Sequence, residues 1–224
     1  MEKKNTENED GLIRLNKYLA STGACSRREA DRLIESGKVT VNGKKAVAGM
    51  KVKGDEVIRM GDKEVEPPQK KVVLAFYKPV GVTVSHDDPH ASATVEEYLD
   101  YPVRLTYAGR LDKDSEGLLL MTNDGALIQA IMKGSHGHEK EYIVTLDKEP
   151  QAEDIKELAK GIYLLDLKVK TRPCRVEKIS HNSVRMVLTQ GLNRQIRRMW
   201  SAKGYRVRKL KRVRRSEERR VGKE

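Results

Sequence analysis

Residues 64–71 read EVEPPQKK and separate two segments of the chain that follow different patterns. The stretch holds two adjacent prolines and four charged residues and has no hydrophobic period, as is typical of a linker. Apolar residues recur at helical spacing before it and mostly at strand spacing after it. The 224 residues suffice for one small and one medium-sized domain. We therefore predict a first domain at 11–65, a linker at 66–71, a second domain at 72–212, and disordered ends at 1–10 and 213–224.

The first domain is predicted to begin with two helices. LIRLNKYL, at residues 12–19, places its leucines and its tyrosine on one helical face. Ser26 and Glu29 have the spacing of a capping box that opens a second helix, and Gly37 suits the end of that helix. The buried stripe of this second helix is predicted to be Ala30, Leu33 and Ile34.

A β-hairpin is predicted to follow the two helices. Asn42-Gly43 lies between strand-like runs, a pair favoured in two-residue hairpin turns, and a short strand near 57–60 completes the unit. Five basic residues of this unit are candidate contacts to the phosphates of a nucleic acid: Lys17, Arg27, Arg28, Arg32 and Lys38. The alternative is that the unit is a structural appendage.

The segment after the linker is predicted to form an α+β domain with mostly antiparallel strands. Seven runs have strand character: VVLAFYKP, PVRLTYAG, LLLMT, KEYIVTL, LKVKT, RVEKI and SVRMVLT. Helices are predicted near 94–99, 125–132, 151–160 and 193–203.

The charge of the chain favours a polyanionic partner. The net charge is +12, and residues 190–224 hold 14 Lys and Arg against three Asp and Glu, a net charge of +11. Such a segment binds nucleic acid by releasing counterions, although it could also be a solvated basic tail. There is no apolar run long enough for a transmembrane helix and no apolar stretch near the N-terminus that suits a signal peptide. With only two cysteines, far apart, we expect a cytoplasmic protein without disulfides and without membrane contact.

Motifs of several enzyme classes are absent from the sequence. It contains no Gly-rich phosphate loop, no GxGxxG and no GxSxG. The one stretch that gathers possible metal ligands, SHDDPH at 85–90, reads as a turn because of its Asp-Pro pair. We therefore expect no metal site.

The stretch GRLDKDSEGLLLMTNDG, at 109–125, holds three aspartates that could all be ordinary turn or cap residues. Asp124 precedes the helix predicted at 125–132 and suits its N-cap, and Asp114 suits a solvated loop. The pattern G-R-L-D-x-x-S-x-G-L-L-L-x-T-N-D-G resembles the catalytic motif of bacterial ribosomal-RNA pseudouridine synthases. The match extends to YKPVGVTVS (77–85), HEKEYIV (138–144), QGLNRQIRRMW (190–200) and YRVRKLKR (205–212), in the order and at the spacing of that family.

The first domain resembles the S-four-type RNA-binding domain that precedes the catalytic domain in one branch of the family. The resemblance covers about residues 11–212 and is strongest to enzymes that act on large-subunit ribosomal RNA. It stops after Arg212, and we expect that the natural C-terminal segment has been lost or replaced.

The resemblance implies a function and a set of site residues. The enzyme would isomerise a specific uridine of ribosomal RNA, or of a ribosomal subunit precursor, to pseudouridine as a monomer without a cofactor, and a transfer RNA could be a second substrate. Asp112 would be the nucleophile, attacking either the sugar or the base. Tyr142 would stack on the base, Arg197 would pair with Asp112, and Leu210 would pack beneath the uracil.

Further arginines are assigned to RNA binding. Arg110 would fill the space that the flipped base leaves, and Arg194 and Arg198 would face the RNA. Four of the assigned residues have alternative roles. Arg110 could form a surface salt bridge, Tyr142 could be a core tyrosine, Leu210 could serve core packing alone, and Arg197 could face RNA or solvent. A competing hypothesis for the whole chain is an RNA-binding assembly factor without enzymatic turnover.

Overall fold

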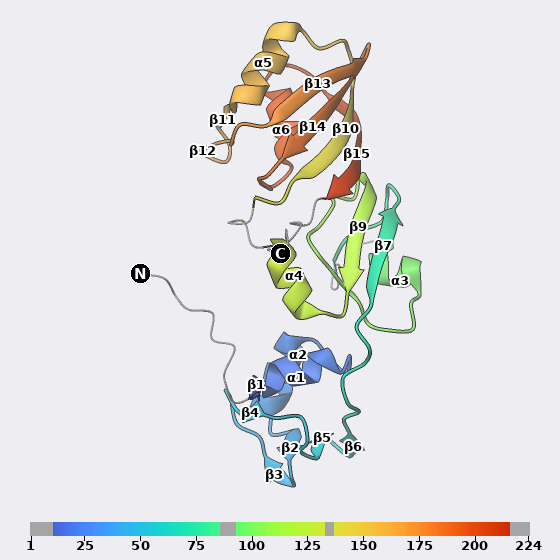
Figure 1. Ribbon diagram of the computed structural model, residues 1–224, viewed down its shortest axis with the longest axis vertical. Coiled ribbons are helices and arrows are strands. Elements are labelled where there is room, and N and C mark those ends of the chain that lie inside the picture. Colours follow the sequence, from blue (N-terminus) through green and yellow to red (C-terminus); the bar gives the residue numbers. More distant parts are fainter. Residues whose placement is uncertain (1–10, 86–92, 133–136, 216–224) are drawn as a thin grey trace, which may run out of the picture. The chain divides into compact units, whose positions relative to one another are not determined.

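The structure, a computed structural model, describes residues 11–85, 93–132 and 137–215 (Figure 1). By its internal contacts the chain forms two units, Met1–Val72 with Asn123–Gly125 and Val73–Thr122 with Ala126–Glu224. The Asn123 side chain explains why a short piece joins the first unit, because it accepts a hydrogen bond from the Val72 amide (2.8 Å) and donates one to the Lys70 carbonyl (2.9 Å). The predictions for 1–10, for the SHDDPH turn beyond Ser85 and for 216–224 lie outside the described residues.

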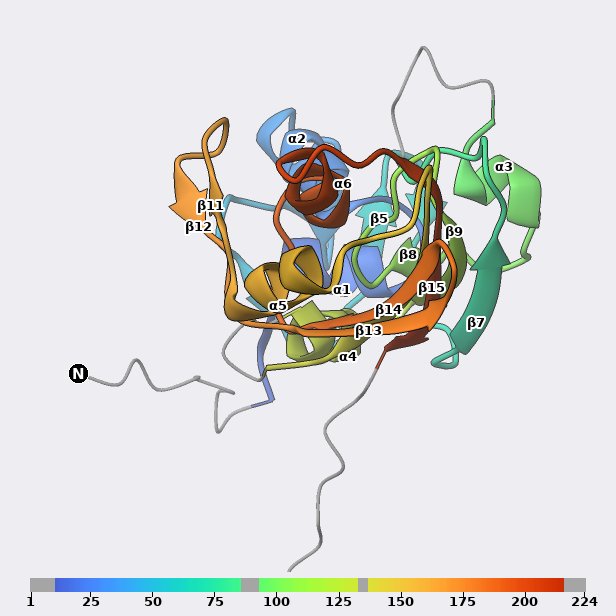
Figure 2. The same cartoon turned by 90° about the horizontal axis from the view of Figure 1, so that it is seen from above.

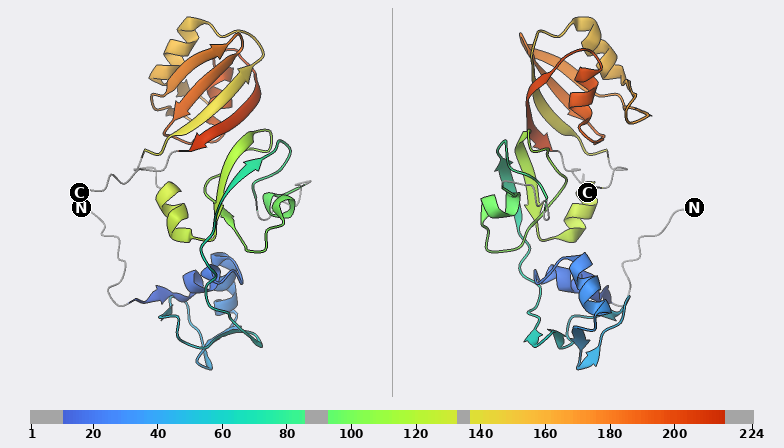
Figure 3. Two further views of the ribbon diagram at one scale, coloured as in Figure 1. Left: turned by 45° about the vertical axis from the view of Figure 1, so that its right-hand side comes forward. Right: turned by 180° about the vertical axis from the view of Figure 1, so that it is seen from behind.

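The first unit holds two short helices, α1 (Leu15–Ser21) and α2 (Arg27–Glu35) (Figures 1 and 3). Both helices bury apolar side chains. Helix α1 begins three residues later than predicted, because Ile13 and Arg14 form a strand that pairs with Lys51–Val52. Helix α2 begins as predicted, with the Ser26 hydroxyl accepting a hydrogen bond from the Glu29 amide (3.1 Å).

The end of α2 follows the predicted glycine signal. Gly37 has a φ of +69°, which glycine adopts without strain. The Gly37 amide donates to the Ile34 carbonyl and the Lys38 amide donates to the Leu33 carbonyl, the pair of bonds that ends a helix in a Schellman motif. The Asn42-Gly43 turn is also as predicted, with both residues at positive φ.

The strands of the first unit are short. They are β1 (Ile13–Arg14), β2 (Val39–Val41), β3 (Lys44–Lys45), β4 (Lys51–Val52), β5 (Ile58–Met60) and β6 (Lys63–Glu64), with β3-β2-β5-β6 in one sheet and β1-β4 in another. Leu15 and Leu19 of α1, Ala30 of α2 and Val39 of β2 are fully buried in one core between helices and sheet. Burial of these apolar side chains is the main force that holds so small a unit together.

A mixed sheet of seven strands runs through the second unit, in the order β13-β14-β10-β15-β9-β7, with β8 added to β9. All its pairings are antiparallel except that of β15 with β9. The strands of this unit are β7 (Val73–Lys78), β8 (Thr106–Tyr107), β9 (Glu116–Thr122), β10 (Lys140–Leu146), β11 (Tyr163–Leu164), β12 (Val169–Lys170), β13 (Arg175–Ser180), β14 (Ser183–Leu188) and β15 (Val207–Arg215). The predicted α+β class with mostly antiparallel strands is confirmed.

The helices of the second unit coincide with the four predicted ones. They are α3 (Val95–Leu99), α4 (Gly125–Met132), α5 (Ala152–Lys160) and α6 (Gln195–Ser201). Helices α5 and α6 lie on one face of the part of the sheet that holds β13, β14, β10 and β15 (Figure 2). Trp200 of α6 is fully buried there, its indole N–H donating to the Met186 sulfur (3.2 Å), so that α6 is fixed on the sheet. No helix in the described part of the chain is long and apolar enough to cross a membrane.

The parallel pairing of β15 with β9 brings two of the family-like motifs side by side: YRVRKLKR (205–212) and GRLDKDSEGLLLMTNDG (109–125). Gly117 pairs with Arg212, and a Cβ atom on Gly117 would lie 2.2 Å from the Arg212 carbonyl oxygen, so only glycine fits. The prediction of a disordered tail from residue 213 is wrong for 213–215, because β15 continues to Arg215, whose side chain is buried. Its guanidinium donates to the Ala108 carbonyl, a partner that no local sequence pattern indicates.

Candidate active site

The turn that carries Asp112 lies between β8 and β9. Lys78, the last residue of β7, contacts this turn. Lys78 is fully buried, and its Nζ donates to the carbonyls of Pro79 and Val82 (2.8 Å each) and of Lys113 (3.5 Å). The Ser115 amide closes the turn by donating to the Asp112 carbonyl (3.0 Å). Burial lowers the pKa of Lys78 to about 8, although the negative charges of Asp114 and Asp112 act to raise it. Lys78 therefore holds the turn rather than facing a ligand.

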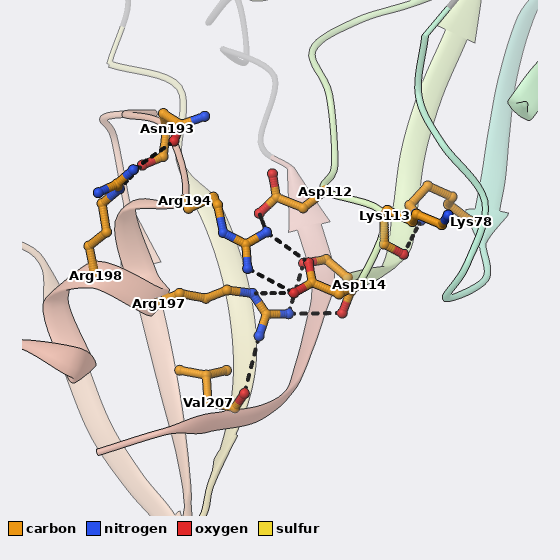
Figure 4. Close-up of polar contacts among 10 residues, drawn as sticks. Lys78, Asp112, Lys113, Asp114, Asn193, Arg194, Arg197, Arg198 and Val207 are labelled. Carbon is orange, nitrogen blue, oxygen red and sulfur yellow. Dashed lines mark hydrogen bonds and ion pairs between the residues drawn. The ribbon is translucent and has the colours of Figure 1, made fainter. Parts of the chain in front are cut away.

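Two arginines of the α6 region meet two aspartates of this turn (Figure 4). Arg194 binds the Asp114 carboxylate with both terminal nitrogens (2.8 and 3.2 Å) and lies 3.7 Å from the Asp112 carboxylate. Arg197 lies 3.3 Å from the Asp114 carboxylate and donates to the Asp114 carbonyl (2.8 Å) and to the Val207 carbonyl (3.1 Å). The bidentate contact fixes the orientation of Arg194 as well as its position.

This arrangement differs from two predictions. Arg197 was expected to pair with Asp112, but Arg194 makes that contact while Arg197 holds the backbone around Asp114. Asp114 was expected to be a solvated loop residue, but its carboxylate lies between both guanidinium groups. Arg194 precedes α6 in a left-handed conformation (φ 48°), whereas Arg197 lies inside the helix, so the two side chains leave the backbone at different places.

The charges around Asp114 decide its ionisation. Burial alone would raise the pKa of the Asp114 carboxyl, but the hydrogen bond from Arg194 and the charges of Arg197 and Arg194 together lower it. Asp114 is therefore ionised over the physiological pH range and keeps Arg194 in place beside Asp112.

The lowered pKa of Asp114 predicts a contribution to stability that depends on pH. A carboxyl with a depressed pKa in the folded state stabilises the fold above its unfolded pKa, about 3.9, and this contribution disappears as the pH falls through the folded pKa. We expect Asp114→Asn to lower the free energy of unfolding at pH 7, and we expect the difference from the wild type to shrink as the pH falls below about 3.9, as measured by urea unfolding from pH 7 to pH 3. Glu177→Gln is the control for losing one exposed carboxylate of β13. A difference that is equally large at pH 7 and pH 3 would contradict the role of the ionised form.

A cavity of about 560 Å³ opens beside Asp112. Five residues predicted for the site line it: Asp112, Tyr142, Leu210, Arg110 and Arg194. Tyr142 is half-buried on β10, and Leu210 is buried on the neighbouring β15, where it pairs with Val144. In the described part of the chain Asp112 is the one carboxylate on the wall of this cavity.

The remaining predicted residues lie elsewhere. Arg197 lines a second hollow, together with residues 204–208, and not the cavity beside Asp112. Arg198 donates to the carbonyl and the side-chain oxygen of Asn193 (2.9 and 3.1 Å) and forms an ion pair with Asp166, so its guanidinium is engaged within the protein. All five basic residues predicted for RNA binding in the first unit are exposed: Lys17, Arg27, Arg28, Arg32 and Lys38.

Four further cations of the cavity wall were not predicted: Lys140, Arg172, Arg212 and Arg215. Lys140 lies two residues before Tyr142 on β10, and Arg212 lies two residues after Leu210 on β15. Because residues two apart in a strand share one face, this spacing could have indicated both. The described residues contain no cluster of His, Cys, Asp and Glu that could hold a metal ion.

The chain matches two protein families and several known proteins. Residues 72–202 match the model of the RNA pseudouridylate synthase family, and residues 13–58 match that of the S4 domain. The chain is 42% identical over 207 residues to the dual-specificity RNA pseudouridine synthase RluF of Escherichia coli (strain K12), covering 92% of this chain and 70% of that protein. It is 36% identical over 209 residues to the ribosomal large subunit pseudouridine synthase B of Bacillus subtilis (strain 168), covering 90% and 84%.

A solved structure resembles the chain as a whole. A crystal structure of a pseudouridylate synthase superposes with a TM-score of 0.66 at 29% sequence identity, over 92% of this chain and 89% of that one. The family match spans more than half of the chain and includes the turn of Asp112, the strand of Tyr142 and the start of α6. The chain therefore belongs to the RNA pseudouridylate synthase family and is an RNA pseudouridine synthase with an S4 domain.

Proposed function

We propose that this enzyme converts one specific uridine of large-subunit ribosomal RNA to pseudouridine, with Asp112 as the nucleophile. The observation that supports the proposal most is the cavity, which among the described residues is lined by a single carboxylate together with an aromatic side chain and a buried leucine. The name of the Bacillus subtilis relative supports large-subunit RNA as the substrate, and the dual specificity in the name of RluF agrees with a second RNA substrate, for which we propose a transfer RNA.

The chemistry requires no atoms beyond those of the substrate. The N1–C1′ bond of uridine breaks, the uracil turns, C5 bonds to C1′, and the proton of C5 is lost while N1 gains one. Asp112 would assist by attacking C1′ or the base, and either route leaves it free at the end. Such an isomerisation has no redox step, so we expect it to proceed without a cofactor or metal.

Each neighbour of Asp112 has a proposed part. Tyr142 stacks on the turning uracil and Leu210 packs beneath it, so that the base is held while the glycosidic bond is broken. Arg194 takes the place proposed from the sequence for Arg197, because its guanidinium lies 3.7 Å from the Asp112 carboxylate and can orient it. Arg197 positions the turn through its bonds to Asp114 and Val207.

Arg110 is proposed to contact RNA at the mouth of the cavity. Its side chain is exposed and lines the cavity next to Asp112. A planar guanidinium can stack in the gap that an extruded base leaves in the RNA, which offsets part of the cost of unstacking.

The experiment that tests the function uses the purified enzyme and protein-free large-subunit ribosomal RNA. Chemical labelling of pseudouridine followed by primer extension should reveal a new modification at one position. A chain that binds the RNA tightly yet leaves every uridine unchanged would favour the assembly factor. We also propose that the enzyme acts in the cytoplasm as a monomer. Sedimentation at the mass of one chain would agree with this.

The S4 domain is proposed to bind phosphates with Arg27, Arg28 and Arg32. All three side chains are exposed on α2, and only Arg32 has an ion pair among the described residues, a 3.8 Å contact with the exposed Glu29. A tethered basic module raises the effective concentration of the RNA at the second unit.

Replacing these three arginines by alanine should weaken RNA binding and its dependence on salt. Removing one cation that neutralises a phosphate reduces the slope of log affinity against log salt by about 0.7 for single-stranded RNA, so the slope should fall by up to about 2. The control removes three exposed lysines from the strands of the same unit: Lys44, Lys51 and Lys63. An unchanged slope in the arginine variant, or an equal fall in both variants, would contradict RNA binding by α2.

A further inference from the structure

Lys140 and Arg212 flank Tyr142 on the cavity wall. Lys140 lies on the same strand and face as Tyr142, and Arg212 pairs with Tyr142 across the β10–β15 ladder. A Cβ atom on Gly191 would lie 3.5 Å from Lys140 Nζ, so the ammonium group reaches the loop between β14 and α6. Two cations are thus brought together where the target base is proposed to stack.

The acidic residues next to Lys140 in the chain do not neutralise it. Glu139 and Glu141 precede and follow Lys140 in the chain and bind arginines that do not share this cavity wall with it: Arg214 contacts both (3.1 and 2.8 Å). In the described part of the chain, neither Lys140 nor Arg212 forms an ion pair with a carboxylate. The positive charge of this wall is therefore not balanced locally by the protein.

Arg212 is held with one nitrogen unused. Its side chain is 2% exposed, and its Nε donates to the Leu118 carbonyl (2.7 Å) while Nη1 lies 3.5 Å from the Arg110 carbonyl. Its Nη2 is buried without a hydrogen-bond partner among the described residues. Buried donors of this kind are rare because they lose their water without gaining an acceptor. An acceptor from the substrate would satisfy it.

We propose that Lys140 and Arg212 bind a phosphodiester group of the RNA adjacent to the target uridine. This inference rests on the proposed function, since it assumes that the base lies on Tyr142 next to Asp112. The uracil and the ribose are neutral, so the phosphodiester is the one part of the nucleotide whose charge complements this wall. Burial, followed by the charges of Arg215 and Arg212, lowers the pKa of Lys140 to about 8, as is expected for a cation whose counter-ion is missing.

The pair would thus place the ribose relative to Asp112. A phosphate fixed on one side of Tyr142 restricts the rotation of the nucleotide when its base is turned over. Lys140 and Arg212 would act as positioning residues, whose loss slows the reaction without removing the nucleophile.

The test combines one protein change with one change in the RNA. The substrate is a short RNA hairpin with the target uridine and a single uncharged methylphosphonate linkage, placed on its 5′ or its 3′ side. Single-turnover rates are measured for the wild type, for Lys140→Met and for Lys140→Arg, with Lys209→Met on the exposed face of β15 as the control. The wild type on unmodified RNA must form pseudouridine, and if it does not, the proposed function fails rather than this inference.

We expect the wild type to slow about tenfold with the neutral linkage at one of the two positions. Lys140→Met should be slowed to a similar degree on unmodified RNA and should slow little further with that linkage, because the two changes remove the same interaction. Lys140→Arg and Lys209→Met should keep the full effect of the linkage. The proposal is overturned if the neutral linkage slows Lys140→Met by the same factor as it slows the wild type, at both positions. It is also overturned if Lys140→Met reacts with unmodified RNA at the wild-type rate. If Lys140→Met does not fold, Lys140→Gln takes its place.

Discussion

Replacing Asp112 by asparagine should abolish pseudouridine formation while leaving RNA binding nearly intact. Asparagine has almost the same shape but cannot act as a nucleophile, and loss of a nucleophile lowers rates by at least about 10⁴-fold. The side chain of Asp112 is one-third exposed, and among the described residues it has one ion pair, with Arg194 at 3.7 Å, so the turn should keep its fold. Pseudouridine is measured by chemical labelling after single turnover, and RNA affinity by filter binding.

The control for Asp112 is a second aspartate of the same turn. Asp114→Asn removes the same charge two residues away and weakens the placement of Arg194, but it leaves the nucleophile in the cavity. We expect this variant to retain measurable turnover. If Asp112→Asn forms pseudouridine at the wild-type rate, the assignment of the nucleophile is wrong. If both variants lose all activity, the arginine cluster rather than Asp112 alone determines the chemistry.

Replacing Arg194 by methionine should have the second largest effect. Arg194 contacts both aspartates, and the loss of a preorganised charge beside a reacting group costs on the order of 100-fold in rate. Arg198→Met is the matched control, because Arg198 lies four residues after Arg194, inside α6, and binds Asn193 and Asp166 without lining the cavity. We expect its single-turnover rate to stay within about threefold of the wild type, the change expected for a surface ion pair.

The same series separates Arg194 from Arg197. Arg197→Met removes bonds to the Asp114 and Val207 carbonyls, so we expect a lower thermal stability together with a decrease in rate. Arg194→Met should lose rate with a smaller change in stability, because its side chain is 42% exposed against 13% for Arg197. A wild-type rate in Arg194→Met with a large decrease in Arg197→Met would restore the pairing that the family resemblance implies.

Much of the first unit could be predicted from the sequence because its signals are local. The Ser26 cap, the end of α2 at Gly37 and the Asn42-Gly43 turn each depend on residues within a few positions of one another. The start of α1 was wrong because Ile13–Arg14 pairs with a strand nearly 40 residues further on. Two-residue strands of this kind have no periodicity to detect.

The candidate site shows the same division between local and distant signals. Asp112 and Leu210 could be placed together only through the family resemblance, since the β15–β9 contact joins residues about 95 positions apart. The contacts of Arg194 and Arg197 with Asp114 were not predicted, because these arginines lie 80 and 83 positions away in the chain. Lys140 and Arg212 could have been found, because each lies two residues from a predicted site residue on the same strand.

The most direct test of the central claim is a map of pseudouridines in large-subunit ribosomal RNA from cells that lack this gene. The map is repeated after the gene is restored as the wild type or as Asp112→Asn. We predict that one pseudouridine disappears with the gene, returns with the wild type and stays absent with Asp112→Asn. Its return with Asp112→Asn, or an unchanged map in the cells that lack the gene, would contradict the account.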